Sequence, residues 1–239
     1  MDDADRVAGC REGSCTRSGH PRRRRHHVSP SNAKVPATPP APLTLDAREH
    51  LRSFDGILWR VFATRGPHPQ AWDELRHFGP IRTMRFDPHP EPQQHHADYG
   101  VMYAAAGSTT ALGEVFQKGR LINRRVRGNT LAAWRPTREL RLLDLTSNWP
   151  VINGTTSSIQ MGPKRYTRNW ANAIHDQLGS SIDGLYHVSS IDFGPMVTLF
   201  SPAEDSFPQL PLVHTRLDSS SANVYLAKAV KRLGYRVKK

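Results

Sequence analysis

A chain of 239 residues, 37% of them hydrophobic, can bury a sizeable core as one large domain or as two small ones. No apolar run approaches the roughly 20 residues of a membrane-spanning helix, and no apolar segment follows Arg22–Arg25 as in a secretory signal. We therefore expect a cytoplasmic protein without membrane contact. The formal charge of +12 fits any polyanionic partner, whether nucleic acid, acidic protein or pyrophosphate-bearing ligand.

Residues 1–45 differ in composition from the rest of the chain. They contain no Phe, Trp or Tyr, and they end in the proline-rich run 35–42. Such a composition does not repay the entropy of ordering, so we predict a disordered extension over residues 1–45 and a folded domain over residues 46–239. The Arg22–Arg25 run can touch nucleic acid non-specifically, and we expect no other nucleic-acid binding.

The extension also holds both cysteines of the chain, Cys10 and Cys15. The predicted domain therefore contains neither a disulfide nor a thiol nucleophile. The two thiols lie near three histidines in the sequence, but their spacing matches no zinc motif, so we expect no metal site there.

The domain begins with an apolar run of strand character, Ile57–Phe62, which carries Arg60 in its middle. Burying an unpaired guanidinium is costly, so Arg60 lies either at a strand end in solvent or in a polar cleft. Residues 81–87 predict a second strand, and a polar loop follows over residues 91–98.

Four side chains in and beside this loop are capable metal ligands: His89, His95, His96 and Asp98. They lack the spacing that a helix or a strand would give to a metal site. We therefore expect no metal ion in this protein.

The next unit predicts a strand that turns directly into a helix. The apolar run Val101–Ala106 breaks at Gly107, Ser108 and Thr109 offer helix N-caps, and the helix is expected to run to about residue 120. This arrangement lets Tyr103 and Glu114 face one cleft. A glutamate early in a helix also has a purely structural explanation, because it complements the helix dipole.

The remaining periodicities predict short strands and scattered helices. Strands are expected over residues 130–134, 139–145, 184–188, 196–200 and 211–217, and helices over residues 165–178 and 220–233. Strands and helices do not alternate regularly, so the sequence predicts an α+β fold with a single mixed-sheet domain. Nucleotide-binding, hydrolase-elbow, zinc-protease and CxxC motifs are all missing.

An ordered set of segments resembles the RES domain, a family named for its Arg, Glu and Ser residues. The segments span about residues 57–200, and the ordered set is more specific than any one of them: Leu58-Trp-Arg60-Val, Arg85-Phe-Asp-Pro, Val101-Met-Tyr103-Ala, Ala111-Leu-Gly-Glu114-Val-Phe, Leu142-Leu-Asp-Leu145 and Asp183-Gly-Leu-Tyr-His-Val-Ser189.

The resemblance implies a fold related to ADP-ribosyltransferases and an activity on NAD as substrate. The family's best-known members are toxins of RES–Xre toxin–antitoxin systems that split the nicotinamide–ribose bond by hydrolysis or by phosphorolysis. The implied partners are NAD, inorganic phosphate as a co-substrate of phosphorolysis, and a separate Xre-like antitoxin. Two alternatives stay open, namely ADP-ribosyl transfer on the same fold and a basic nucleic-acid-binding or interaction protein without catalysis.

The resemblance also implies roles for five residues. Arg60, Tyr103 and Glu114 take catalytic positions, and Arg60, Arg85, Tyr103 and Ser189 take substrate-binding positions, with Ser190 as the alternative register for the serine. Where the toxins commonly have two glycines before the second arginine, this chain has Thr83 and Met84.

The chemistry of these residue types agrees with that assignment. Neutral nicotinamide is a good leaving group, so its departure from NAD needs no general acid, and a carboxylate near the ribosyl centre stabilises the developing positive charge. Arginines hold a pyrophosphate or position a phosphate acceptor through charge-assisted hydrogen bonds.

Overall fold

The computed structural model describes residues 34–238. The predictions for Cys10, Cys15 and Arg22–Arg25 therefore lie outside the described residues. Among residues 34–238, none of the helices combines the length and hydropathy that crossing a membrane requires.

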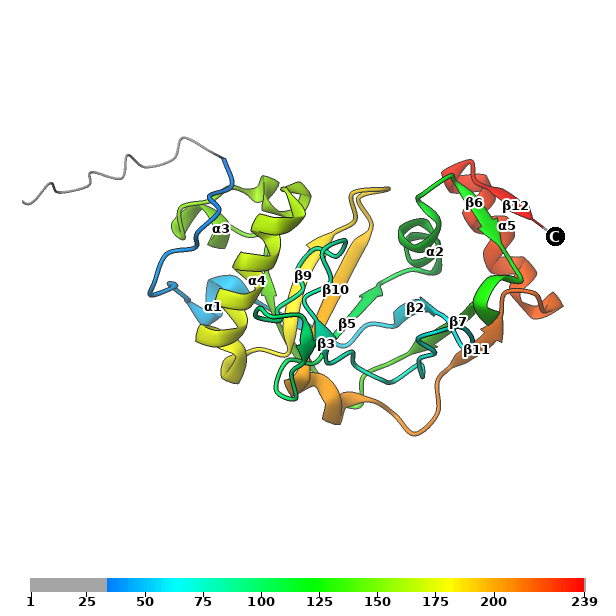
Figure 1. Ribbon diagram of the computed structural model, residues 1–239, viewed down its shortest axis with the longest axis horizontal. Helices are drawn as coiled ribbons and strands as arrows, with labels where there is room; N and C mark the ends of the chain where they lie inside the picture. Colours follow the sequence, from blue (N-terminus) through cyan, green and yellow to red (C-terminus); the bar gives the residue numbers. More distant parts are fainter. Residues whose placement is uncertain (1–33, 239) are drawn as a thin grey trace, which may run out of the picture. The chain divides into compact units, whose positions relative to one another are not determined.

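The described residues are built on one eight-stranded sheet (Figure 1). Its spatial order is β1-β8-β9-β10-β5-β2-β7-β11. Only β8 and β9 run parallel; the other pairs are antiparallel. The predicted single mixed sheet is confirmed. Its strands are β1 (Leu51–Phe54), β2 (Leu58–Phe62), β5 (Val101–Ala105), β7 (Thr130–Trp134), β8 (Leu140–Asp144), β9 (Gly184–Val188), β10 (Pro195–Phe200) and β11 (Val213–Arg216).

Two small sheets complete the strand content. β3 (Phe78–Gly79) pairs with β4 (Gln94–His95), and β6 (Leu121–Asn123) pairs in parallel with β12 (Arg236–Lys238). These strands are two or three residues long, too short for any alternation of apolar and polar residues to reveal them in the sequence.

Five α-helices accompany the sheet: α1 (Ala47–His50), α2 (Ser108–Phe116), α3 (Trp149–Ile152), α4 (Lys164–Leu178) and α5 (Asn223–Leu233). α1, α3 and α4 lie toward the β1 end of the sheet, and α2 and α5 lie toward the β11 end (Figure 1). The predicted helical spacing in α4 is confirmed, since Trp170, Ala171, Ile174 and Leu178 are buried against the sheet.

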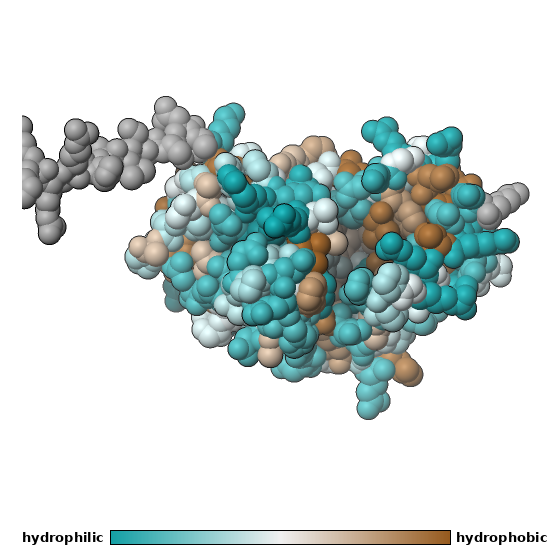
Figure 2. Space-filling model, in the orientation of Figure 1, coloured by the Kyte–Doolittle hydropathy of each residue, from teal (hydrophilic) through white to brown (hydrophobic). Residues whose placement is uncertain are grey.

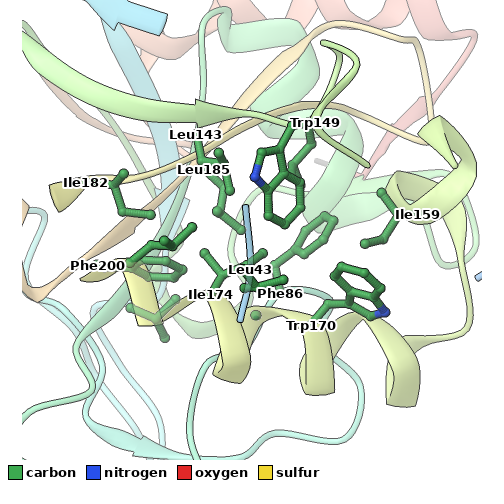
Figure 3. Close-up of a cluster of buried hydrophobic side chains, with 14 of the residues drawn as sticks. Leu43, Phe86, Leu143, Trp149, Ile159, Trp170, Ile174, Ile182, Leu185 and Phe200 are labelled. Atoms are coloured by element: carbon green, nitrogen blue, oxygen red, sulfur yellow. The ribbon is translucent and has the colours of Figure 1, made fainter. Parts of the chain in front are cut away.

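Alternation along the strands gives the sheet two faces with different cores. One face, called the helix face here, packs against α4 through Leu143 and Leu185 (Figure 3). The same face packs against α2 through Ala105. The opposite face, called the loop face, carries Leu58 and Met102 under a loop that supplies Trp72 and Leu75, among other residues. Which face a residue occupies therefore decides whether it can reach the helices.

Residues 34–45 belong to the folded body. Val35 and Leu43 are buried in the α4 core, and backbone carbonyls of this segment accept hydrogen bonds from two buried indoles. Trp170 Nε1 donates to Pro36 O at 2.9 Å and Trp149 Nε1 donates to Thr44 O at 2.8 Å. The predicted disordered extension is therefore wrong for residues 34–45, because two apolar anchors and two paired carbonyls hold a proline-rich segment that has no aromatic residue of its own.

The strand predicted over residues 81–87 is also wrong. Met84 N donates to Ile81 O at 3.0 Å, and the Asp87 carboxylate accepts from Ile81 N at 2.7 Å, so the segment closes on itself as a turn. Phe86 has a φ of 51° and turns its ring into the α4 core (Figure 3). Phe86 therefore packs in the core against α4 and does not contribute to a face of the sheet.

Gly184, at the start of β9, allows the backbones of β9 and β10 to approach closely. A Cβ there would lie 2.1 Å from the backbone oxygen of Thr198, and the φ of +155° adds strain. We expect Gly184→Ala to lower the free energy of unfolding by roughly 3 kcal/mol or more, measured by urea denaturation. Gly107→Ala is the control, because nothing lies within 4 Å of a Cβ at Gly107. Equal stability of the two variants would contradict this account.

Candidate active site

Glu114 lies in the last turn of α2, not in its first turns. The helix starts at Ser108, and its N-cap is Gly107, whose backbone is extended. Ser108 and Thr109 are therefore the first helical residues, and the prediction that they cap the helix is wrong. A carboxylate near the negative C-terminal end of a helix is disfavoured by about 0.3–1 kcal/mol, so the helix dipole does not explain Glu114.

A hydrogen bond holds the Glu114 carboxylate in place. Ser189 Oγ donates to Glu114 Oε1 at 2.5 Å and accepts from Ile191 N at 3.0 Å. Ser189 is only 1% exposed and follows β9 directly, whereas Glu114 is half-buried. Of the two registers for the serine, residue 189 is the one whose hydroxyl bonds the carboxylate.

Further contacts join α2 to the turn between β9 and β10. Thr110 Oγ1 donates to Asp192 Oδ2 at 2.9 Å, and Gly194 packs so closely on Thr110 that a Cβ would lie 2.2 Å from Thr110 Oγ1. The turn and the helix therefore form one rigid wall that fixes the Glu114–Ser189 pair.

Tyr103 lies in the middle of β5, on the helix face of the sheet. It pairs with Thr198 on β10, and its ring is half-buried against the α4 core. No described residue hydrogen-bonds its buried hydroxyl. Burial raises the pKa of Tyr103, and the charge of Asp87 raises it further against the opposing effect of Arg76, so the phenol stays protonated.

His187, near the end of β9, contacts the strand residue that pairs with Tyr103. His187 Nε2 lies 3.0 Å from Thr198 Oγ1, the cross-strand neighbour of Tyr103, and the His187 ring packs on Phe86 at 4.9 Å between centroids. Ser189 follows β9 two residues after His187, so strand alternation directs both side chains to the same side of the sheet. Sequence reasoning missed His187, because it stands inside an ordinary strand pattern and gave no signal beyond its residue type.

Arg85 directly precedes Phe86, whose ring packs in the core on the helix face, and therefore lies on the same side of the sheet. Its Nε donates to Gly162 O at 3.4 Å, and its terminal nitrogens have no acceptor among the described residues. Burial lowers the pKa of His187, and the positive charge of Arg85 lowers it further. Thr83 and Met84, at the positions of the family's glycines, have no positive φ, so this turn does not require glycine.

Arg60 does not join the other predicted residues. It is buried on the loop face of β2, where Nη1 donates to Ala71 O, Trp72 O and Glu74 O at 3.1–3.3 Å, and Nη2 donates to Gln70 Oε1 at 3.1 Å. Burial lowers the pKa of Arg60 to about 10, against the raising effect of Glu74 and Asp73. Arg60 therefore lies in a buried, polar environment and not at a strand end in solvent. The polar groups around it are those of the loop at residues 70–74.

The structure thus brings four of the five predicted residues to the helix face of the sheet: Arg85, Tyr103, Glu114 and Ser189. In Figure 2 the surface is hollowed between the part that carries α4 and the part that carries α2. This hollow is called the central cleft here. The four residues on the helix face offer a positioned carboxylate, an aromatic ring and a guanidinium whose terminal nitrogens have no acceptor among the described residues.

The loop histidines have other partners. His89 Nδ1 lies 2.5 Å from Asp87 Oδ1, and Asp87 also accepts from Arg76 Nη2 at 2.8 Å. Burial acts to raise the pKa of Asp87, but the His89 bond and the Arg76 charge together hold it below its usual value. Within residues 34–238, no group of three or more His, Cys, Asp or Glu side chains is arranged to hold a metal ion.

The described residues thus form a mixed α+β fold, and the helix face of its large sheet carries a hydroxyl-oriented carboxylate and an arginine. Residues 57–218 match the RES domain, and the chain belongs to the RES domain family. The predicted resemblance is confirmed.

Among solved structures, one similar chain comes from the crystal structure of the M. tuberculosis MbcT–MbcA toxin–antitoxin complex. It is 14% identical, covers 77% of this chain and 93% of its own length, and has a TM-score of 0.48. The comparison with curated proteins gives no match.

His187 predicts a pH dependence of stability. Burial lowers its pKa from 6.5 to about 4. Between these two values the unfolded chain binds a proton that the folded chain does not, so stability is full above pH 6.5 and falls as the pH drops toward 4. We expect the loss of melting temperature between pH 7 and pH 5 to be smaller in His187→Gln than in wild type. Identical pH profiles would show that His187 does not titrate in this way.

The bonds of Arg60 to the loop predict that replacing Arg60 lowers the stability of the fold. Arg60→Ala removes a buried guanidinium and leaves three loop carbonyls without their donor, and we expect it to lower the free energy of unfolding by roughly 3 kcal/mol. The matched variant Arg85→Ala removes a half-exposed guanidinium with one long bond and should cost less than about 1 kcal/mol. Urea unfolding curves measure both, and an undiminished stability of Arg60→Ala would refute the role of loop anchor.

Proposed function

We propose that this protein is an NAD-degrading toxin that cleaves the bond between nicotinamide and ribose. Membership of the RES family supports the substrate. The observation that carries the proposal is the Glu114 carboxylate, held by Ser189 in the last turn of α2, where the helix dipole opposes it. A charge kept in an unfavourable position and aimed by a buried hydroxyl is typical of a catalytic group.

Glu114 acts on the ribosyl centre. As nicotinamide leaves with the electrons of the N-glycosidic bond, positive charge develops on C1′ and the ring oxygen of the ribose. A carboxylate beside that centre stabilises the charge. Its second oxygen accepts a long bond from Gln117 Nε2 at 3.4 Å and can accept another from a ribose hydroxyl or an incoming water. Ser189 orients the carboxylate and does not attack the substrate.

Arg85 and Tyr103 hold the substrate. The terminal nitrogens of Arg85 can donate to the pyrophosphate, and the half-buried ring of Tyr103 offers a face to nicotinamide or ribose. In this proposal Arg60 supports the loop at residues 70–74. The catalytic and binding roles that the family resemblance implies for Arg60 stay a prediction.

The nucleophile that completes the reaction is water or inorganic phosphate. Water gives ADP-ribose, whereas phosphate gives ADP-ribose 1″-phosphate, with Arg85 as the candidate to position the phosphate. Transfer of ADP-ribose to a protein is the third outcome, and incubation with labelled NAD would reveal it as a labelled band.

NAD loss stops growth, so a cell that makes this enzyme needs a means to restrain it. A separate antitoxin protein, Xre-like as in the family's known systems, is the partner that we propose. Because the proposed substrate is cellular NAD, we propose that the enzyme acts in the cytoplasm.

Glu114→Gln tests the activity. The amide keeps a hydrogen bond to Ser189 but carries no charge, so we expect nicotinamide release from NAD to fall by about 10²–10³-fold. Free nicotinamide is measured by chromatography, with and without inorganic phosphate, and the mass of the second product distinguishes hydrolysis from phosphorolysis. Wild-type protein that leaves NAD intact under both conditions would sink the proposal.

Ser189→Ala extends the same assay and has a matched control in the adjacent residue. Loss of a hydrogen bond to a carboxylate costs about 1.5–3 kcal/mol, so we expect kcat to fall by about 10- to 100-fold with little change in KM. Ser190→Ala should retain wild-type kcat, because Ser190 makes no bond to Glu114. If both alanine variants behave alike, the Ser189–Glu114 bond does not position the carboxylate.

A further inference from the structure

A strongly basic surface of the described residues lies at the end of the sheet that carries α2 and α5. It consists of the exposed Lys and Arg side chains of residues 118–127 and 228–238, and it is called the basic surface here. The sequence has no Asp or Glu between Glu114 and Glu139, and none after Asp218. Both segments are therefore basic without any internal carboxylate.

The fold brings the two segments together. β6 pairs with β12 in parallel, Arg236 N donates to Arg120 O at 3.0 Å, and Arg124 N donates to Lys238 O at 3.4 Å. Arg236 and Lys238 alternate with Val237, which packs inward, so both cations face solvent on one side of β12. Figure 1 shows β6, β12 and α5 grouped together at the C-terminal end of the chain.

Neighbouring carboxylates do little to neutralise this surface. Arg232 Nε lies 3.9 Å from Asp192, whereas Asp218 is engaged by Arg216 and Glu114 by Ser189. On α5, Lys228, Lys231 and Arg232 are three and four residues apart and repel one another. The C-terminal helix dipole favours Lys231 and Arg232, but it does not account for the cations outside α5.

Backbone strain supplies an independent observation. Arg120 has a φ of 48° and Arg127 a φ of 53°, and both are exposed. Left-handed backbone costs free energy in any residue with a Cβ, and glycine would adopt it freely. Stability alone would favour glycine at both positions, so the two arginines point to a use for their charge.

We propose that the basic surface binds the phosphate backbone of a double-stranded nucleic acid. Lys and Arg side chains without carboxylate partners are what phosphate contacts require. The only aromatic residue in the two segments is Tyr235, which is 5% exposed, so bases of a single strand find no stacking platform. Exposed apolar side chains in the two segments include the single valines Val126 and Val230, without the bulky residues that anchor a protein in a membrane.

Anisotropy of a fluorescein-labelled duplex of about 20 base pairs, titrated with the full chain, tests the proposal over about 50–200 mM salt. The surface variant changes Arg125, Arg127, Lys231 and Arg236 to Ala. The matched control changes Arg22–Arg25 to Ala and removes the same number of charges. We expect the surface variant to bind at least about tenfold more weakly, with a salt slope lowered by about 0.9 for each lost phosphate contact, and the control to keep most of the affinity.

A second variant keeps the test decisive if the first fails to fold. Arg120→Gly combined with Arg127→Gly relieves the strained backbone, so we expect a higher melting temperature together with weaker duplex binding. A higher melting temperature with unchanged binding overturns the proposal, as does a control variant that loses as much affinity as the surface variant. Displacement of the duplex by poly-glutamate at equal charge concentration, or binding to anionic vesicles without binding to the duplex, also overturns it. Nicotinamide release by the surface variant and by the Arg22–Arg25 control should match wild type, which separates this proposal from the proposed enzyme activity.

Discussion

The hydrogen bond from Ser189 to Glu114 connects the two parts of the fold on which the site depends. Ser189 follows β9, so its position is set by the sheet. Glu114 lies in the last turn of α2, so its position is set by the packing of α2 against α5 and β2. Because Ser189 Oγ also accepts from Ile191 N, the hydroxyl hydrogen is directed at the carboxylate. One buried hydroxyl thus fixes an anionic group that neither the helix dipole nor an adjacent ion pair would hold.

Strand alternation decides which of the candidate residues can act together. Trp59 is the register partner of Ala105, and Tyr103 shares the face of Ala105, so Arg60 points to the opposite side. Sequence comparison gives the order of these residues along the chain but not the register between β2 and β5. That register is a long-range property, and a shift of one residue would have exchanged the roles of Trp59 and Arg60.

The parts of the fold that were predictable carry strong local signals. α4 and the strands of the large sheet have clear periodicity or apolar runs bounded by turn residues, and the Tyr103–Glu114 unit has a glycine break between its two elements. Failures occur where tertiary contacts override composition. Residues 34–45 are ordered by two indoles supplied from α3 and α4, and Phe86 adopts a left-handed backbone to fill a core that residues 81–87 do not themselves reveal.

The charge distribution connects the cleft with the rest of the molecule. Buried charges are individually compensated, as in the Asp87 carboxylate with Arg76 and the Arg60 guanidinium with loop carbonyls, so they contribute little net field. The exposed cations are largely uncompensated and give the body a positive potential that attracts anions to its surface. A dinucleotide with a pyrophosphate would be steered to the cleft by this potential, whereas the Glu114 carboxylate would resist it locally. The Ser189 bond therefore holds the Glu114 carboxylate in the position where, in the proposed reaction, positive charge develops only in the transition state.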